Sequence, residues 1–399
     1  MKNSTRFILL TTFLNFLGFT IIIPVIPFLV QQFSSAANVA FNVGMITSSY
    51  ALCQFLAAPG LGMLSDRFGR RPILLISLAG SVVGYIIFGI GGSLWMLFLG
   101  RIIDGLTGGN ISTIYAYIAD VTEPKDRGKI YGLAGAAGGI GFMVGPAIGG
   151  LAANISLSAP LFIAAGVTFL NIIWGYFALP ESLKPKDRIN ELKLSHLNPF
   201  GQLKVIFSIK LLQTLFLVTF LFFVAATALQ SNASLYMKDI LQWGPGQVGF
   251  ILFIVGVIDI VAQGYLTGKL LPIFGETKLA IIGLILNGLG FLLFGSVAFF
   301  PSALLMYIST IVFVLGDGLF EPAISGMIAN SVEPKMQGRI QGASQGIQSV
   351  ARIIGPLYAA WLYGYSAGLP YLTSAIIIAV CLLVVGFSLS TIAKHKFHA

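Results

Sequence analysis

The sequence predicts an all-α polytopic membrane protein with twelve transmembrane helices in two pseudo-symmetric six-helix bundles. The first reason is composition, because 56% of the 399 residues are hydrophobic and 9% are charged, whereas a soluble domain carries roughly 25% charged residues. The second is a series of apolar segments of about 20 residues, the length that crosses a bilayer. The third is an internal repeat that relates the two halves of the chain.

The apolar segments follow one another with short polar connections. The first follows Lys2 and Arg6, as in a signal peptide, but it is too long for such a peptide and is interpreted as an uncleaved first helix. The predicted helices occupy residues 7–31, 41–63, 72–91, 94–119, 129–152, 158–179, 211–236, 245–267, 278–299, 302–329, 338–363 and 369–392.

The distribution of Lys and Arg supports this helix count. Arg101 and Arg352 lie inside predicted helices, and 20 of the other 21 basic residues lie in segments on one side of the membrane. Lys238 is the single basic residue on the opposite side. Because cytoplasmic segments are enriched in Lys and Arg, we expect both termini in the cytoplasm and the protein in the cell (inner or plasma) membrane.

The longest polar segment divides the predicted helices into six and six. We therefore expect an N-terminal bundle over residues 1–180, a cytoplasmic linker over 181–210 and a C-terminal bundle over 211–399. The net charge of +9 does not indicate nucleic-acid binding, because the basic residues lie between apolar segments and form no basic face of a soluble domain.

The two halves carry related sequences. VTEPKDRGKIYG (121–132) recurs as SVEPKMQGRIQG (331–342) at an offset of 210 residues. GMLSDRFGRR (62–71) has a degraded copy, GKLLPIFGET (268–277), at an offset of 206. Since six helices separate the copies, they share one orientation in the membrane. Such parallel repeats are typical of transporters, whose two bundles rock about a site near the middle of the membrane.

The loop between predicted helices two and three carries a motif that resembles the major facilitator superfamily. Its residues are Gly62, Asp66, Arg67, Gly69, Arg70 and Arg71. The glycines permit a tight turn, and the arginines are suited to an anionic cytoplasmic leaflet. Asp66 is expected to face the positive N-terminus of helix eleven near Gly338 and to act as a latch between the halves. The alternative is an ordinary basic cytoplasmic loop.

A glycine-rich motif lies on predicted helix five. Its spacing resembles the antiporter motif of drug/proton exchangers within the superfamily, which implies an exporter whose helix five seals against a neighbour. Plain packing of small residues is the alternative. The motif consists of Gly132, Gly141, Gly145, Pro146, Gly149 and Gly150.

Charged residues inside the predicted helices are costly and are expected to be paired or functional. Arg101 resembles the superfamily's intramembrane arginine, and Asp104, three residues on, can reach it. Asp317 and Glu321 share one helix face, where two carboxylates cannot both ionise cheaply. Arg352 is their expected charge partner. A fully paired structural network is the alternative.

The closest resemblance is to tetracycline/proton antiporters and other drug exporters with twelve helices. Where those antiporters have aspartates within helices one, three and nine, this chain has Asn15, Gly84 and Asn287, and Asp259 stands in place of a helix-eight histidine. The resemblance therefore implies drug export, but the tetracycline–metal and proton chemistry of that group does not carry over to this chain. Polar and aromatic residues expected to line a substrate cavity are Asn15, Gln54, Tyr115, Gln230, Asn232, Gln263 and Phe320.

The leading hypothesis is a secondary active exporter that exchanges drug-like or amphipathic molecules for protons by alternating access. Asp317, Glu321, Asp259 and Asp104 are the candidates for proton coupling. Proton-coupled uptake of a sugar or other metabolite, and a lipid flippase on the same fold, are the alternatives. No G-x4-G-K-[ST] loop or His/Cys metal cluster is present in the sequence, so we expect neither an enzyme nor a cofactor or metal. The expected partners are the lipid bilayer, a small molecule and protons, and the expected functional form is a monomer.

Overall fold

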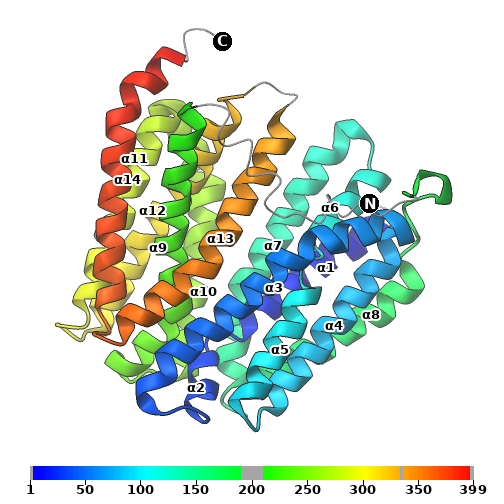
Figure 1. The fold of residues 1–399 in the computed structure, drawn as a ribbon, viewed down its shortest axis with the longest axis horizontal. Coiled ribbons are helices and arrows are strands. Elements are labelled where there is room, and N and C mark those ends of the chain that lie inside the picture. Colours follow the sequence, from blue (N-terminus) through cyan, green and yellow to red (C-terminus); the bar gives the residue numbers. More distant parts are fainter. Residues whose placement is uncertain (1–2, 190–209, 333–335, 396–399) are drawn as a thin grey trace. The chain divides into compact units, whose positions relative to one another are not determined.

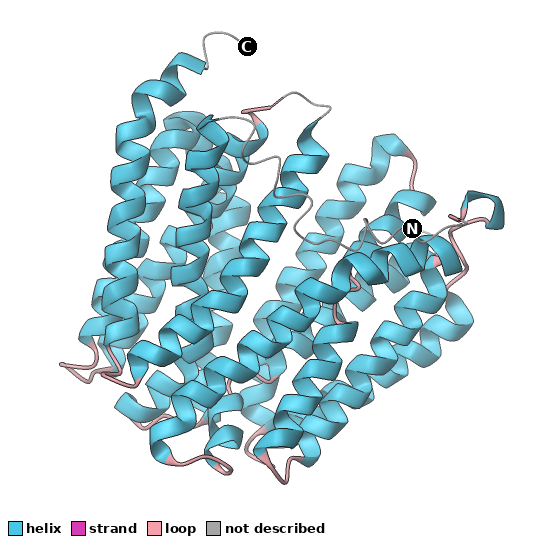
Figure 2. Ribbon diagram, viewed as in Figure 1, coloured by secondary structure: helices cyan, strands magenta, loops and turns pink. Residues whose placement is uncertain are grey.

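The structure is a computed structural model that describes residues 3–189, 210–332 and 336–395. Within these residues the regular structure is helical and contains no strand (Figure 2). The chain divides into two compact units. Unit 1 consists of Met1–Asn42, Ile46–Pro199 and Trp243–Gly256, and unit 2 of Val43–Met45, Phe200–Gln242 and Val257–Ala399. The domain boundaries expected from the sequence stay a prediction, and most of the expected linker lies outside the described residues.

Two predicted helices of the N-terminal half are broken, and the other four are continuous. The first breaks at residues 22–25, where Pro24 removes a backbone donor. The fourth breaks at Gly108–Asn110, directly after the last turn of α5, in which the Gly108 N–H donates to the Asp104 carbonyl at 2.6 Å. The helices are α1 (Asn3–Ile21), α2 (Ile26–Gln31), α3 (Val39–Phe68), α4 (Arg70–Ile90), α5 (Leu94–Thr107), α6 (Ile111–Val121), α7 (Pro124–Ala152) and α8 (Ala159–Ala178), with short 3-10 turns at Ala36–Asn38 and Pro185–Asp187 (Figure 1).

The C-terminal half differs from prediction where helices eight and nine meet. A π-helical turn, η5 (Ala262–Leu266), follows α10, and the helical assignment then continues through the expected loop. Gly275, at φ 71°, interrupts it with a left-handed residue and so marks the true boundary between the two spans. The helices are α9 (Lys210–Leu241), α10 (Pro245–Val261), α11 (Thr267–Ser296), α12 (Ala303–Ala329), α13 (Gln337–Tyr363) and α14 (Leu369–His395).

The same helix pairs pack in each half. In unit 1, α1 packs on α7 and α8, and α4 packs on α5 and α8. In unit 2, α9 packs on α13 and α14, and α11 packs on α12 and α14. These are the pairs that the sequence repeat relates. Part of the unit 1 core is formed by Phe7, Leu74 and Tyr117, from α1, α4 and α6.

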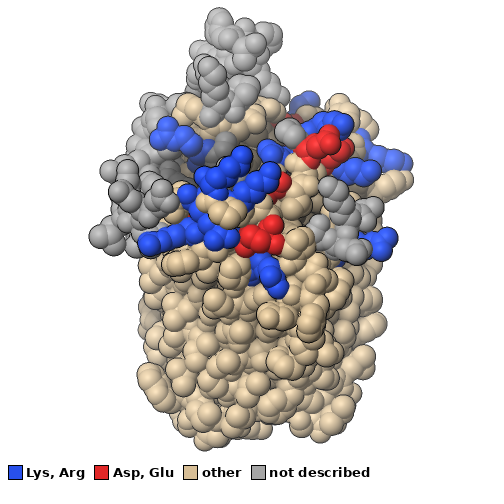
Figure 3. Space-filling model, turned by 90° about the vertical axis from the view of Figure 1, so that its right-hand side faces the viewer, with Lys and Arg blue, Asp and Glu red and all other residues tan. Residues whose placement is uncertain are grey.

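Eight stretches among the described residues are long and apolar enough to cross a membrane. One of them, Pro245–Ser296, is 52 residues long and contains two of the predicted spans. The breaks in the first and fourth spans shorten those helices, and the Gln and Arg residues of α13 lower its hydropathy. On the face drawn in Figure 3, the visible charged side chains gather towards one end, and uncharged residues cover the rest. This pattern is that of a protein with a lipid-facing belt.

Candidate functional site

The motif between α3 and α4 forms a turn held by a distant carboxylate. Gly69 adopts a left-handed φ of 108°, and a side chain there would overlap the carboxylate of Glu181, which follows α8. Glu181 accepts hydrogen bonds from the backbone N–H groups of Arg70 at 2.9 Å and Arg71 at 3.3 Å. A carboxylate at a helix N-terminus satisfies free backbone donors and favours the helix dipole. Glu181 therefore fixes the start of α4.

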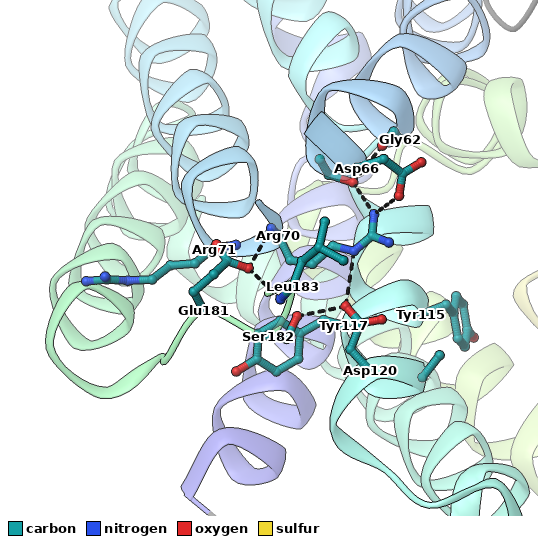
Figure 4. A network of polar contacts seen from close by, with 12 residues as sticks. Gly62, Asp66, Arg70, Arg71, Tyr115, Tyr117, Asp120, Glu181, Ser182 and Leu183 are labelled. Atoms are coloured by element: carbon teal, nitrogen blue, oxygen red, sulfur yellow. Dashed lines mark hydrogen bonds and ion pairs between the residues drawn. The ribbon is translucent and has the colours of Figure 1, made fainter. Parts of the chain in front are cut away.

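The buried side chain of Arg70 lies at the centre of the network in Figure 4. Its Nη1 lies 2.5 Å from Asp66 Oδ1 and donates to Ser65 Oγ at 2.7 Å, both on α3. Its Nε lies 3.3 Å from Asp120 Oδ2, on α6. Ser182 Oγ donates to the same Asp120 oxygen at 2.9 Å. The arginine thus ties together the ends of three helices and the segment after α8.

Sequence reasoning found the loop motif but missed Asp120 and Glu181. Their signal was weak, since each is an isolated acid at the end of an apolar segment. The expected latch between Asp66 and the helix near Gly338 stays a prediction. Within unit 1, Asp66 is paired with Arg70, four residues on along the same chain segment.

The remaining motif residues have local contacts. Arg67 lies 5.4 Å from the centre of the Phe68 ring. Arg71 donates to the Tyr176 carbonyl and lies 5.4 Å from the centre of that ring. The Gly62 carbonyl accepts a hydrogen bond from Ser65 Oγ at 2.7 Å.

The glycine-rich motif of α7 is a contact surface for α1. A side chain at Gly141 would overlap the Phe13 carbonyl, and one at Gly149 would overlap the Ile21 carbonyl. Gly150 faces a different segment, since a Cβ there would lie 2.6 Å from the Pro245 carbonyl. Gly132 has no atom within 4 Å of such a Cβ. Four of the five glycines are therefore needed for close packing, and Gly132 is not.

A threonine occupies the notch left by the glycine before each repeated proline. In unit 1, Thr20 Oγ1 fills the space at Gly145 and lies 3.4 Å from the Gly141 carbonyl. In unit 2, Thr227 Oγ1 fills the space at Gly355 and donates to the Ala351 carbonyl at 3.1 Å. Pro146 and Pro356 follow the two glycines in sequence. Sequence reasoning missed both threonines.

Arg101 and Asp104 form the predicted ion pair on α5. Arg101 Nη1 lies 3.2 Å from Asp104 Oδ2, and each side chain is 3% exposed. The Arg101 guanidinium also lies 4.2 Å from the centre of the Tyr50 ring. Gly84 makes room for this pair, because a Cβ there would lie 2.8 Å from Asp104 Cβ. Gln54 donates to the Gly108 carbonyl at 3.1 Å, close to the end of α5.

The other unit 1 cavity candidates lie at separate positions. Asn15 is half-buried, and its Oδ1 lies 3.5 Å from Asn110 Nδ2, which joins α1 to the break between α5 and α6. Tyr115 is 40% exposed, and its ring lies 5.3 Å from that of Tyr131 in an edge-on arrangement. No described contact joins Tyr115 to the Arg101–Asp104 pair.

The predicted carboxylates of the second half come together in unit 2. Asp259 lies on α10, and Asp317 and Glu321 lie one turn apart on α12. Asp317 lies near Glu321 and Asp259, and Glu321 lies near both Asp259 and Arg352. Asp317 Oδ1 is buried and has no hydrogen-bond partner among the described residues.

The close approach of η5 to α12 depends on Gly318. A Cβ at Gly318 would lie 2.5 Å from Ala262 Cβ and 3.5 Å from Asp259 Oδ1. Thr267 Oγ1 donates to the Gly318 carbonyl at 2.9 Å, and Gln263 Nε2 donates to Asp259 Oδ1 at 2.8 Å. The π-helical turn of η5 lies between these contacts, and such turns frequently occur at functional sites.

The four cavity candidates of unit 2 differ in burial. Gln230 and Gln263 are exposed, whereas Asn232 is fully buried. Phe320 is also fully buried, and its ring lies 4.1 Å from that of Phe222. The structure therefore gives Phe320 a packing contact within unit 2. Among the described residues, no group of three or more His, Cys, Asp or Glu side chains is arranged to hold a metal ion.

A repeated helical architecture with buried charges in its apolar helices defines a polytopic membrane protein of the transporter type. The sequence matches the Major Facilitator Superfamily over residues 8–229 and again over 215–397. The chain belongs to this superfamily.

Relatives of known name match the chain over nearly its full length. The class C tetracycline resistance protein of Escherichia coli is 34% identical over 388 residues, which cover 96% of each chain. Multidrug resistance protein 2 of Bacillus subtilis is 27% identical over 400 residues, which cover 99% of this chain and 96% of the relative. A solved bacterial homologue of the human lysosomal transporter Spinster superposes with a TM-score of 0.79 at 14% identity, over 98% of this chain and 97% of that one.

Proposed function

We propose that this protein is a secondary active transporter that exports drug-like or amphipathic small molecules in exchange for protons. The full-length similarity to tetracycline and multidrug resistance proteins supports drug export. The observation that carries proton coupling is the group of carboxylates in unit 2, where Asp317 and Glu321 lie one turn apart and Asp317 Oδ1 is buried without a partner.

The coupling step assigns a proton to one carboxylate of α12. Burying an ionised carboxylate without a hydrogen-bond partner is costly, and protonation removes that cost. Arg352 favours an ionised Glu321, which leaves Asp317 as the carboxylate that binds a proton from the external side. The proton is released to the cytoplasm when the cavity opens inward and substrate binds. Asp259 and Asp104 are the further candidates for this role.

The proposed substrates are amphipathic molecules other than metal-bound tetracycline. Position 84 has no room for an acidic side chain, because a Cβ there would already lie 2.8 Å from Asp104 Cβ. Asn15 and Asn287 carry amides, which cannot take up the charge changes of aspartates. The relatives named for tetracycline therefore support the class of transport more than the identity of the substrate.

The proposed setting is the cell membrane, with both termini in the cytoplasm and a monomer as the working form. The end at which charged side chains gather in Figure 3 would then face the cytoplasm. A cysteine placed at either terminus should react with an impermeant thiol reagent in everted vesicles and remain protected in intact cells.

Transport assays in everted vesicles test the proposed function. We expect a pH gradient to drive uptake of at least one amphipathic drug from a panel, with protons leaving the vesicle as substrate enters. Uptake should stop when a protonophore collapses the gradient and should continue without ATP. Uptake of sugars or movement of labelled lipids, in place of drug uptake, would overturn the proposal in favour of a metabolite importer or a flippase.

A further inference from the structure

The degraded copy of the loop motif retains the turn of the first copy and a contact of the residue after it, although the residue types differ. At the offset of 206 residues, Gly69 corresponds to Gly275 and Arg70 to Glu276. Both glycines have a left-handed φ, 108° at Gly69 and 71° at Gly275. In each half, a new helical segment therefore begins at the next residue.

In each half, the residue that follows the glycine contacts a side chain near the end of another helix. The two side chains that are contacted occupy positions related by the sequence repeat. At the offset of 210 residues, Asp120 corresponds to Asn330. In unit 1, Arg70 Nε lies 3.3 Å from Asp120 Oδ2 near the end of α6. In unit 2, Asn330 Nδ2 donates to Glu276 Oε1 at 2.7 Å, directly after the end of α12. An ion pair in one half is thus replaced by an amide–carboxylate hydrogen bond in the other.

We propose that Glu276 and Asn330 form a clamp in unit 2 that positions the part of α11 beginning after Gly275 against the end of α12. This unit 2 clamp performs for the second repeat what Arg70 and Asp120 perform for the first. Its role in transport rests on the proposed function, because the clamp would keep α11 and α12 aligned while the protein changes its access.

The change of chemistry has a physical reason. An arginine at a helix N-terminus is unfavourable to the helix dipole, and in unit 1 Glu181 offsets this by accepting the Arg70 and Arg71 N–H groups. Glu276 is itself an acid at the start of its helical segment. Its one carboxylate therefore both interacts favourably with the helix dipole and accepts the hydrogen bond from Asn330. A hydrogen bond to a charged acceptor is stronger than a neutral one.

Gly326 provides the space for this contact. A Cβ at Gly326 would lie 2.8 Å from Glu276 Oε1. The Glu276 side chain therefore lies across the last turn of α12, where a larger residue would displace it. This is a third residue, besides the hydrogen-bonded pair, on which the clamp depends.

The test exchanges the pair for its unit 1 counterpart. Asn330→Asp places two carboxylates together, and Glu276→Arg alone removes the acceptor of the hydrogen bond. The two substitutions combined recreate the ion pair of Arg70 and Asp120. Lys278→Gln, at an exposed position two residues along the same helix, is the control for a change of charge. Drug uptake in proteoliposomes and the thermal unfolding of the detergent-solubilised protein are measured for each variant.

We expect Asn330→Asp to lower the maximal transport rate by about two- to tenfold, the range for one hydrogen bond, with the half-saturating substrate concentration unchanged within about twofold. The double variant should recover part of the rate, since it restores the contact but removes the acid that favours the helix dipole, and Lys278→Gln should match the wild type. A wild-type rate for Asn330→Asp, or a double variant as slow as the slower single, would overturn the clamp.

The unfolding measurements separate this proposal from the proposed function. The effects of the two substitutions on unfolding should be non-additive, because the residues are in contact. If the wild type transports no drug on a pH gradient, the proposed function fails. Non-additivity would then still support the clamp as a contact, and strict additivity would overturn it.

Discussion

Among single residues, Asp317 and Glu321 are those whose substitution tests the proposed proton coupling most directly. Asp259 lies near both Asp317 and Glu321, but the opposing charge of Arg352 lies near Glu321. The two carboxylates are therefore not equivalent, although they lie one turn apart on the same helix. Neutralising each of them separates the carboxylate that carries a proton from the one that is held ionised.

We expect Asp317→Asn to abolish transport driven by a pH gradient and to leave substrate counterflow intact, because exchange requires no net proton movement. Glu321→Gln should reduce both activities less severely. The measurement is paired uptake and counterflow in proteoliposomes, with Ser325→Ala, an exposed position on the same helix, as the control. If both acid variants keep full gradient-driven transport, coupling lies at Asp259 or Asp104. If both also lose counterflow, the pair is structural or binds substrate.

Gly84 is predicted to be intolerant of any side chain. In Gly84→Ala, the new Cβ would lie 2.8 Å from both Asp104 Cβ and the Gly100 carbonyl, and such overpacking costs about 1–3 kcal/mol. Gly139→Ala is the matched control, because it has no atom within 4 Å of its Cβ and alanine favours a helix. Thermal unfolding should show a lower midpoint for the first variant and an unchanged or higher one for the second. Equal midpoints would contradict the close packing of α4 on α5.

At the scale of helices, α7 shows what a motif can and cannot indicate. The glycine spacing predicted close helix packing, and α1 is the helix that packs there. The motif alone did not show that Gly132 is open or that Thr20 fills the notch at Gly145. The spacing of the motif therefore does not show which of its glycines are needed for helix packing.

We expect Gly145→Ala to reduce transport strongly, because its Cβ would overlap Thr20 Oγ1 and lie 2.9 Å from the Leu17 carbonyl. Gly132→Ala, in the same helix and motif, should transport at the wild-type rate. Uptake rates normalised to the amount of protein in the membrane provide the comparison. A strong defect in Gly132→Ala would mean that this glycine contacts something other than the packing described, and equal rates would remove packing as the role of Gly145.

Local spacing explains what the sequence could predict. The Arg101–Asp104 pair was predictable because residues three apart on a helix are neighbours. The contacts of Glu181 with Arg70 and of Asn330 with Glu276 join residues 111 and 54 positions apart, and no periodicity relates them. The π-helical turn of η5 was missed because its apolar pattern does not differ from that of an ordinary helix. The repeat predicts that the two halves have equivalent helix pairs, but it does not predict which helices pack together within a half.

At the scale of the whole molecule, the network around Arg70 bears on how the protein would cycle between access states. Arg70 holds Asp66 on α3 and Asp120 on α6, while Glu181 holds the start of α4. This arrangement joins the ends of α3 and α6 to the start of α4. A defect in it should slow conformational change more than it weakens substrate binding, since none of the predicted cavity residues belongs to it.

Asp66→Asn tests this distinction. The substitution removes the charge that lies 2.5 Å from Arg70 Nη1, while Arg70 retains Asp120 and Ser65 as partners. The fold should therefore survive, and substrate binding in detergent should stay within about threefold of the wild type, since the substitution neutralises a partly exposed carboxylate and leaves the buried Arg70 with a charged partner. Transport should nevertheless fall by a larger factor, because the proposed alternating access would move the helices that this turn connects. Glu123→Gln is the control, because its pair with Lys125 at 2.9 Å is exposed and joins neighbours in one segment.

Binding and transport are measured on the same preparation. Loss of binding to the same degree as loss of transport would show that Asp66 supports the binding site itself, and a wild-type transport rate would show that the pair does not limit the cycle.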